Sequence, residues 1–133
     1  MFSYKYFGMR KILVFGNPYL EEDNLAFRLG EKLGKKGFRV EHCTKPDDLL
    51  NYELKDVLIL DVAKGIDKVE VFDDIDSLEF SVIFSLHDFD LSYFLKLLKE
   101  TGKVEKVNII GIPQGYDEEK AVKEIQELIK GLV

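Results

Sequence analysis

The segment DVLILDV, residues 56–62, restricts the fold of this chain more than any other stretch. Its apolar side chains follow one another almost without interruption, so an extended strand built from it has no polar face. Such strands are typical of the middle of a parallel sheet, where helices cover both faces. The segment therefore indicates an α/β architecture, in which Asp61 is a polar side chain at the end of an apolar strand.

Strand and helix patterns alternate along the rest of the chain. Hydrophobic periodicity predicts strands at 10–16, 38–43, 56–62, 68–74, 79–86 and 106–112, helices at 25–36, 90–102 and 117–133, and a short helix or loop at 46–52. Gly37 follows the first helix, as a left-handed C-terminal cap does. This order predicts a three-layer α/β domain: a mostly parallel, twisted sheet of about five to six strands, with an antiparallel strand from the middle of the chain and helices on both faces.

Length and composition favour one soluble domain. With 133 residues, the chain has the size at which domains cluster, about 100–150 residues. We expect a single domain over residues 1–133, with 1–9 as an N-terminal extension. The opening residues lack the features of a signal peptide, and no apolar stretch approaches the roughly 18 residues of a membrane helix. We therefore expect a cytoplasmic protein with no membrane partner, and its abundant Lys and Glu favour a thermophilic source.

Charge and cysteine content restrict the function. The net charge of −6 disfavours a nucleic-acid partner, because clustered Lys and Arg supply most of the affinity for phosphate backbones. The single cysteine, Cys43, excludes an intrachain disulfide framework and a zinc site with several cysteines. His42 is poorly placed to activate this thiol, because neighbouring residues on a strand point to opposite faces. We interpret Cys43 as a small buried side chain.

Three potential metal ligands fall at the carboxyl ends of predicted strands, where ligands bind in open α/β sheets. Asp23, or its neighbour Glu22, lies in the first turn after the first strand, Asp61 ends the central strand, and His87 precedes a helix. Two carboxylates and one imidazole suit nickel, zinc, iron or manganese and leave positions open for water or substrate. Each also has a plain structural interpretation, as a helix cap, a partner for a loop amide, or a partner for the backbone.

The stretch ILVFGNPYLEEDNLAFRLGEKL resembles the opening of the hydrogenase maturation endopeptidases, nickel-dependent peptidases that trim the large subunit of nickel–iron hydrogenases. In that family a strand is followed by Gly-Asn and then by an acidic pair, which falls here on Glu22 and Asp23. VLILDV supplies the family's second metal ligand as Asp61, and FSLHDFDL supplies the third as His87. The resemblance continues in register over residues 10–112.

The resemblance implies a metal-dependent endopeptidase without a Ser or Cys nucleophile. Asp23, Asp61 and His87 would be both the metal ligands and the catalytic residues. They would bind nickel already carried by the precursor of the hydrogenase large subunit, the implied partner. Cleavage would remove a short C-terminal extension, with the metal polarising the scissile carbonyl or activating a bound water. Glu22 is a candidate general base, with helix capping as the alternative role.

Three loops depart from the family pattern. Asn24 stands where the family commonly has a small residue, HCTKPDD replaces a Gly-Gly-Thr loop and leaves only Thr44 as a counterpart, and the GIPQG turn is about one residue tighter. These departures bear on which precursor is cut and on whether cutting persists. The main alternative is therefore a non-catalytic relative that senses nickel or binds the precursor.

Two further classes of protein fit the pattern less well. A phosphorelay receiver domain has its acidic pair directly after the first strand and a Lys at the end of the fifth, whereas this chain has its acids further on and Pro-Gln after the last strand. A dinucleotide-binding domain needs a turn with three glycines to admit the pyrophosphate. The GNP turn at residues 16–18 has one glycine.

Overall fold

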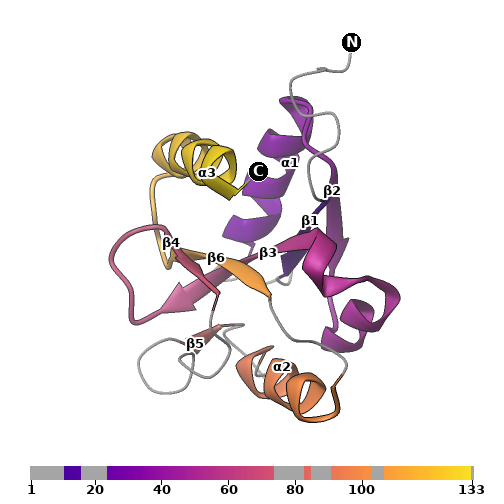
Figure 1. The fold of residues 1–133 in the computed structure, drawn as a ribbon. Coiled ribbons are helices and arrows are strands. Elements are labelled where there is room, and N and C mark those ends of the chain that lie inside the picture. The colour runs from indigo at the N-terminus through magenta and orange to yellow at the C-terminus, as the bar shows by residue number, and fades with distance from the viewer. Residues whose placement is uncertain (1–10, 16–23, 74–82, 85–90, 103–106, 133) are drawn as a thin grey trace.

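The structure is a computed structural model that describes residues 11–15, 24–73, 83–84, 91–102 and 107–132. In chain order the elements are β1 (Lys11–Phe15), α1 (Leu25–Lys35), β2 (Val40–Cys43), the 3-10 helices η3 (Pro46–Asn51) and η4 (Leu54–Asp56), β3 (Val57–Lys64), β4 (Glu70–Phe72), β5 (Ile83–Phe84), α2 (Leu91–Glu100), β6 (Asn108–Pro113) and α3 (Glu118–Leu132). Figure 1 shows the sheet between its helices, which confirms the predicted α/β fold. The predicted N-terminal extension, 1–9, lies outside the described residues.

One sheet of six strands joins all the described strands in the order β2-β1-β3-β6-β4, with β5 paired to β3 off this path. The pairs of β1 with β2, β1 with β3, and β3 with β6 are parallel. β4 runs antiparallel to β6, and β5 runs antiparallel to β3. The sheet is thus mostly parallel, as predicted, and its antiparallel strands β4 and β5 come from the middle of the chain, where one such strand was expected.

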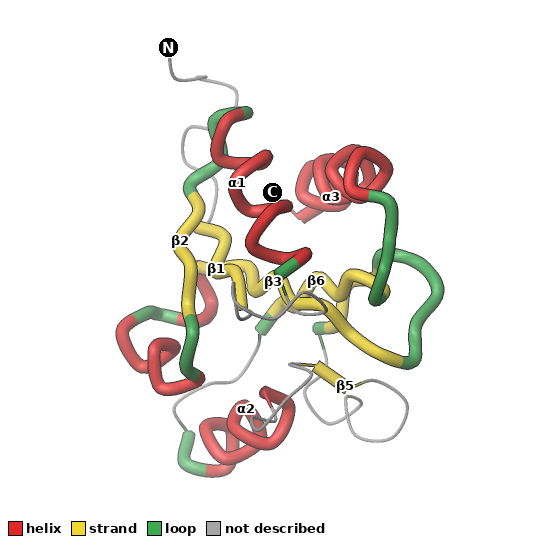
Figure 2. The backbone as a smooth tube through the Cα atoms, turned by 180° about the vertical axis from the view of Figure 1, so that it is seen from behind, coloured by secondary structure: helices red, strands yellow, loops and turns green. Residues whose placement is uncertain are grey.

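The alternation of side chains along β3 builds a core on each face of the sheet. Leu58, Leu60 and Val62 pack with residues of α1 and α3 on one face. Ile59 and Ala63 pack on the other face with residues of α2. Figure 2 shows the same division from behind, with α1 and α3 on one side of the sheet and α2 on the other. We call these the α1/α3 face and the α2 face.

Helix α1 lies close against the sheet because residue 30 has no side chain. A Cβ on Gly30 would stand 2.9 Å from Cγ2 of Val14 in β1 and 3.2 Å from Cε1 of His42 in β2. The helix ends as predicted, where Gly37 takes a positive φ of 100°. The amide of Phe38 donates to the carbonyl of Leu33 at 3.2 Å, which is the long bond of a Schellman motif.

Several predicted strand ends were wrong by a few residues. The strand predicted at 38–43 begins at Val40, and the one predicted at 68–74 is limited to 70–72. Strand β3 continues past residue 62 to Lys64, because β6 pairs with its residues as far as Ala63 and β5 pairs with its last two. Among the helices that the structure describes, none has the length and apolar character needed to cross a membrane.

Candidate functional site

Asp61 lies in β3, the central strand of the sheet, at the level where β1 ends. Val14 of β1 pairs with Leu60, and β1 stops one residue later, at Phe15. On the other side, Asp61 pairs with Gly111 of β6. The sequence interpretation placed Asp61 at the end of its strand, which was wrong, because β3 runs on to Lys64. Asp61 is nevertheless level with the carboxyl end of the neighbouring strand.

The carboxylate of Asp61 is fully buried, with 0% of the residue exposed. By alternation it belongs to the α2 face, between Ile59 and Ala63. The amide of Val62 donates a hydrogen bond of 2.9 Å to Oδ1 of Asp61. Burying a carboxylate costs free energy unless hydrogen bonds or opposite charges offset that cost. An apolar side chain at this position would avoid the cost altogether, so the choice of Asp points to a use for the carboxylate.

The other two predicted ligands, Asp23 and His87, lie outside the described residues, as does Glu22. In sequence, Asp23 directly precedes Asn24, and α1 begins at the next residue. Since α1 connects the parallel strands β1 and β2, its first turn lies at the carboxyl edge of the sheet. On the other side, Phe84 ends β5 and pairs with Ala63, two residues beyond Asp61.

No group of three His, Cys, Asp or Glu side chains that could hold a metal occurs among the described residues. Of the three predicted ligands, those residues include only Asp61. The ligand set of Asp23, Asp61 and His87 therefore stays a prediction. For Asp61, the structure shows that the carboxylate is buried and that a hydrogen bond from Val62 orients it.

Cys43 is a buried side chain whose surroundings disfavour the reactive thiolate. Burial, followed by the negative charges of Asp48 and Glu41, raises the pKa of the Cys43 thiol to about 12, so the reactive thiolate is essentially absent at neutral pH. His42 points to the opposite face and stacks on Phe27 of α1, with ring centroids 4.5 Å apart and ring planes 10° apart. The interpretation of Cys43 as a buried side chain, badly placed for His42, is confirmed.

In the HCTKPDD segment, the side chain of Asp48 accepts hydrogen bonds from the backbone of the same loop. The backbone amides of Thr44 and Lys45 donate to Oδ2 of Asp48, at 3.1 and 3.2 Å. Asp48 belongs to η3, so these hydrogen bonds join the end of β2 to that helix. The exposed Thr44 is thereby held at the carboxyl end of β2, at the same edge of the sheet as the end of β1.

The GIPQG turn joins β6 to α3 at this edge. Gly115 takes a positive φ of 75°, and the amide of Tyr116 donates to the carbonyl of Pro113 at 3.2 Å. Oδ1 of Asp117 accepts a hydrogen bond of 2.9 Å from the amide of Lys120, which caps the first turn of α3. The turn and the start of α3 are therefore well defined beside the end of β6.

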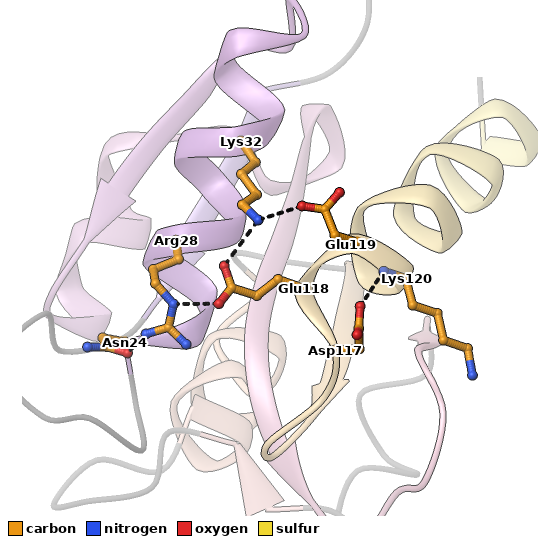
Figure 3. A network of polar contacts seen from close by, with 7 residues as sticks. All are labelled: Asn24, Arg28, Lys32, Asp117, Glu118, Glu119 and Lys120. Carbon is orange, nitrogen blue, oxygen red and sulfur yellow. Dashed lines mark hydrogen bonds and ion pairs between the residues drawn. The ribbon is translucent and has the colours of Figure 1, made fainter.

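A polar network links the first two turns of α1 to the start of α3, and Figure 3 shows it from close by. Nε of Arg28 donates to Oε2 of Glu118 at 2.9 Å, and Nη1 of Arg28 donates to Oδ1 of Asn24. Nζ of Lys32 lies 3.4 Å from Oε1 of Glu118 and 3.1 Å from Oε1 of Glu119. Sequence reasoning missed this network, because Arg28 and Glu118 are 90 residues apart.

The charges in this network act on Glu118 in opposite directions. Burial by itself raises the pKa of its carboxyl group. The hydrogen bond from Arg28 and the positive charges of Arg28 and Lys32 together outweigh burial, so the pKa is lowered from its ordinary 4.5. Glu118 is therefore ionised at neutral pH and contacts two cations of α1, Arg28 and Lys32.

Comparison with known families places most of the chain in a described family. A family model described as hydrogenase maturation protease matches residues 40–133, which is more than half of the chain. The matched part runs from β2 through α3 and includes Asp61 and His87. It does not include β1, α1 or Asp23. Comparisons with curated proteins and with solved structures found no match.

Proposed function

This chain belongs to the hydrogenase maturation protease family, and from that premise we propose that it is a metal-dependent endopeptidase. Its substrate in this proposal is the nickel-loaded precursor of the large subunit of a nickel–iron hydrogenase. The reaction removes a short C-terminal extension from that precursor. The observation that carries the proposal is Asp61, a fully buried carboxylate in the central strand, within the part of the chain that the family model matches.

Asp23, Asp61 and His87 are the proposed ligands of the nickel that the precursor brings. Carboxylate oxygens and an imidazole nitrogen are suitable donors for a divalent first-row metal. The hydrogen bond from Val62 holds one oxygen of Asp61 and so sets the orientation of the carboxylate, as hydrogen bonds to metal ligands commonly do. Three ligands from the peptidase leave the remaining positions to the precursor and to water.

Catalysis in this proposal uses the substrate's nickel and no protein nucleophile. A metal ion in such a site polarises the scissile carbonyl or lowers the pKa of a bound water. The protonated, buried Cys43 supports a mechanism without a thiol. We propose Glu22 as the general base that accepts the proton of the attacking water, because it is a carboxylate next to Asp23 in the sequence and outside the ligand set.

The proposal places the reaction in the cytoplasm. The single Cys43 supports this location, since thiols stay reduced there and disulfide frameworks are rare. The net charge of −6 supports a protein substrate rather than a nucleic acid, which would call for clustered positive charge.

Two ligand substitutions test the metal assignment. Asp23→Asn and His87→Ala should each abolish cleavage of a nickel-loaded precursor, because each removes one donor to the metal. Circular dichroism and thermal unfolding should show a native fold in both variants. The mass of the large subunit, followed by mass spectrometry, reports cleavage. Cleavage at the wild-type rate in both variants would refute the ligand set.

One observation favours the alternative function, that of a non-catalytic relative which binds the precursor. Asn24, beside the first proposed ligand, has its side chain engaged by Arg28, whereas the family commonly has a small residue at that position. A binding module would form a complex with the precursor and leave its length unchanged. Enzymatic function requires shortening of the precursor by substoichiometric amounts of this protein.

A further inference from the structure

We propose that Arg28 is a positioning residue for the active site: it ties Asn24, at the start of α1, to Glu118, at the start of α3. This inference rests on the proposed function, in which Asp23, the residue directly before Asn24, binds the nickel. Arg28 itself touches neither substrate nor metal in this proposal. Its role is to set where the first turn of α1 stands relative to the rest of the carboxyl edge.

Arg28 contacts Asn24 through its backbone, as any residue at this helix position would, and also through its side chain. The backbone amide of Arg28 donates to the carbonyl of Asn24 at 3.1 Å, and Nη1 of the guanidinium donates to Oδ1 of the Asn24 side chain. Asn is among the strongest helix N-caps, yet this Asn side chain makes no capping hydrogen bond and its backbone is helical. The side chain of Asn24 is therefore used to bind Arg28 and not to cap the helix.

The other end of the guanidinium is held by α3. Nε of Arg28 donates to Oε2 of Glu118 at 2.9 Å, while the other carboxylate oxygen faces Lys32 at 3.4 Å. Glu118 opens α3, whose first turn Asp117 caps. A guanidinium has its donors in one rigid plane, so simultaneous bonds to Asn24 and Glu118 fix its orientation.

These contacts are better suited to positioning than to stabilising the fold. The side chains of Arg28 and Glu118 are 44% and 29% exposed, and exposed ion pairs contribute little to folding. Small errors in position, by contrast, strongly affect catalysis: a misplacement of about 1 Å can cost roughly 100-fold in rate. A glycine or an alanine in place of Asn24 would have no side-chain oxygen for Arg28, so the link depends on the side chain at position 24.

Two matched variants separate positioning from ion pairing. Arg28→Ala and Lys32→Ala each remove a cation that contacts Glu118 from α1, but only Arg28→Ala also removes the link to Asn24. We expect Arg28→Ala to lower kcat on the nickel-loaded precursor by about 10- to 100-fold, the range seen when supports of metal ligands are removed. The KM of Arg28→Ala should stay within about twofold of the wild-type value. Both kcat and KM of Lys32→Ala should also stay within about twofold, because an exposed ion pair contributes little.

Two further variants test the geometry of the link. Arg28→Lys keeps the charge but has no planar fork, so it should not restore kcat, whereas a purely electrostatic role predicts that it would. Asn24→Ala should lower kcat like Arg28→Ala, and the double variant should lose little more, since both changes break one link. Amide hydrogen exchange at the first hydrogen-bonded amides of α1, those from residue 28 onwards, should become faster in Arg28→Ala and stay unchanged in Lys32→Ala, which is a readout without catalysis.

The outcomes distinguish this inference from the proposed function. An active wild-type protein with equal kcat losses in Arg28→Ala and Lys32→Ala would overturn the positioning role alone. An active wild-type protein with full activity in Arg28→Ala, or in Arg28→Lys, would do the same. A wild-type protein that binds the nickel-loaded precursor without cutting it would instead overturn the proposed function, and with it any catalytic role for Arg28.

Discussion

At the scale of single residues, the buried Asp61 and the buried Gly30 have roles that larger apolar side chains could not take. Asp61 carries a carboxylate in the apolar centre of the sheet, with Val62 as a hydrogen-bond donor. Gly30 lets α1 approach β1 and β2. The sequence marked Asp61 because it interrupts an apolar run, but the packing around Gly30 depends on side chains from other elements and had no sequence signal.

Asp61→Asn distinguishes a ligand from a structural acid. The asparagine side chain has nearly the same shape, and its Oδ1 can accept the same hydrogen bond from Val62, so a role limited to shape and to that hydrogen bond predicts retained cleavage. A ligand role predicts a loss of at least about 100-fold, because changes to mere supports of ligands already cost about 10- to 100-fold. Initial rates on nickel-loaded precursor, normalised to folded protein, measure the difference.

At the scale of elements, pairing partners decide where strands end and which helices meet. β3 extends to Lys64 because β5 and β6 pair with its last residues, and no pattern within 56–62 contains that information. The junction of α1 with α3 likewise joins side chains 90 residues apart. Helix boundaries were predicted more closely, since amphipathic spacing and Gly37 are local signals.

The packing of α1 on the sheet is tested by a pair of glycine substitutions in that helix. Alanine gains about 1 kcal/mol of helix propensity over glycine, and nothing lies within 4 Å of a Cβ at Gly34, so Gly34→Ala should stabilise the protein by up to that amount. At Gly30 the new Cβ would meet Val14 at 2.9 Å, and overpacking costs about 1–3 kcal/mol.

Gly30→Ala should therefore be neutral to destabilising, by up to about 2 kcal/mol, when the propensity gain is subtracted from the cost of overpacking. Urea unfolding followed by circular dichroism measures the free energies of unfolding of Gly30→Ala and Gly34→Ala. Equal stabilisation by Gly30→Ala and Gly34→Ala would show that α1 does not need a glycine to approach β1.

The stability that Glu118 contributes at the junction of α1 with α3 should depend on pH. The pKa of Glu118 is lowered from 4.5 in the folded protein, so its ionised form is favoured by folding. This stability is fully present above pH 4.5 and is lost as the pH falls through the lower pKa of the folded state. Between pH 5 and pH 7 it should not change.

Glu118→Gln isolates this contribution. Wild-type protein should be more stable than Glu118→Gln at pH 6, and the difference should shrink as the pH falls through the lowered pKa of Glu118 in the folded protein, because the wild-type side chain then becomes neutral like that of Gln. Thermal unfolding at a series of pH values measures this gap in stability between wild type and Glu118→Gln. A gap that stays constant from pH 6 to pH 3 would mean that the charge of Glu118 is not what holds Arg28 and Lys32.

At the scale of the whole molecule, the parallel strands bring the ends of β1, β2 and β6 to one edge, and the match to the hydrogenase maturation proteases covers residues 40–133. The fold class was predictable because alternating strand and helix patterns leave few architectures. The order of the strands was not, since pairing of β4 with β6 and of β5 with β3 depends on contacts between distant segments.

The most direct test of the central claim compares nickel-loaded with nickel-free large-subunit precursor. Each is incubated with a substoichiometric amount of this protein, and the intact mass of the large subunit is followed by mass spectrometry. The proposal predicts that only the nickel-loaded precursor becomes shorter, with loss of a C-terminal peptide and many turnovers per protein molecule. A nickel-loaded precursor that keeps its full mass while bound to this protein would contradict it.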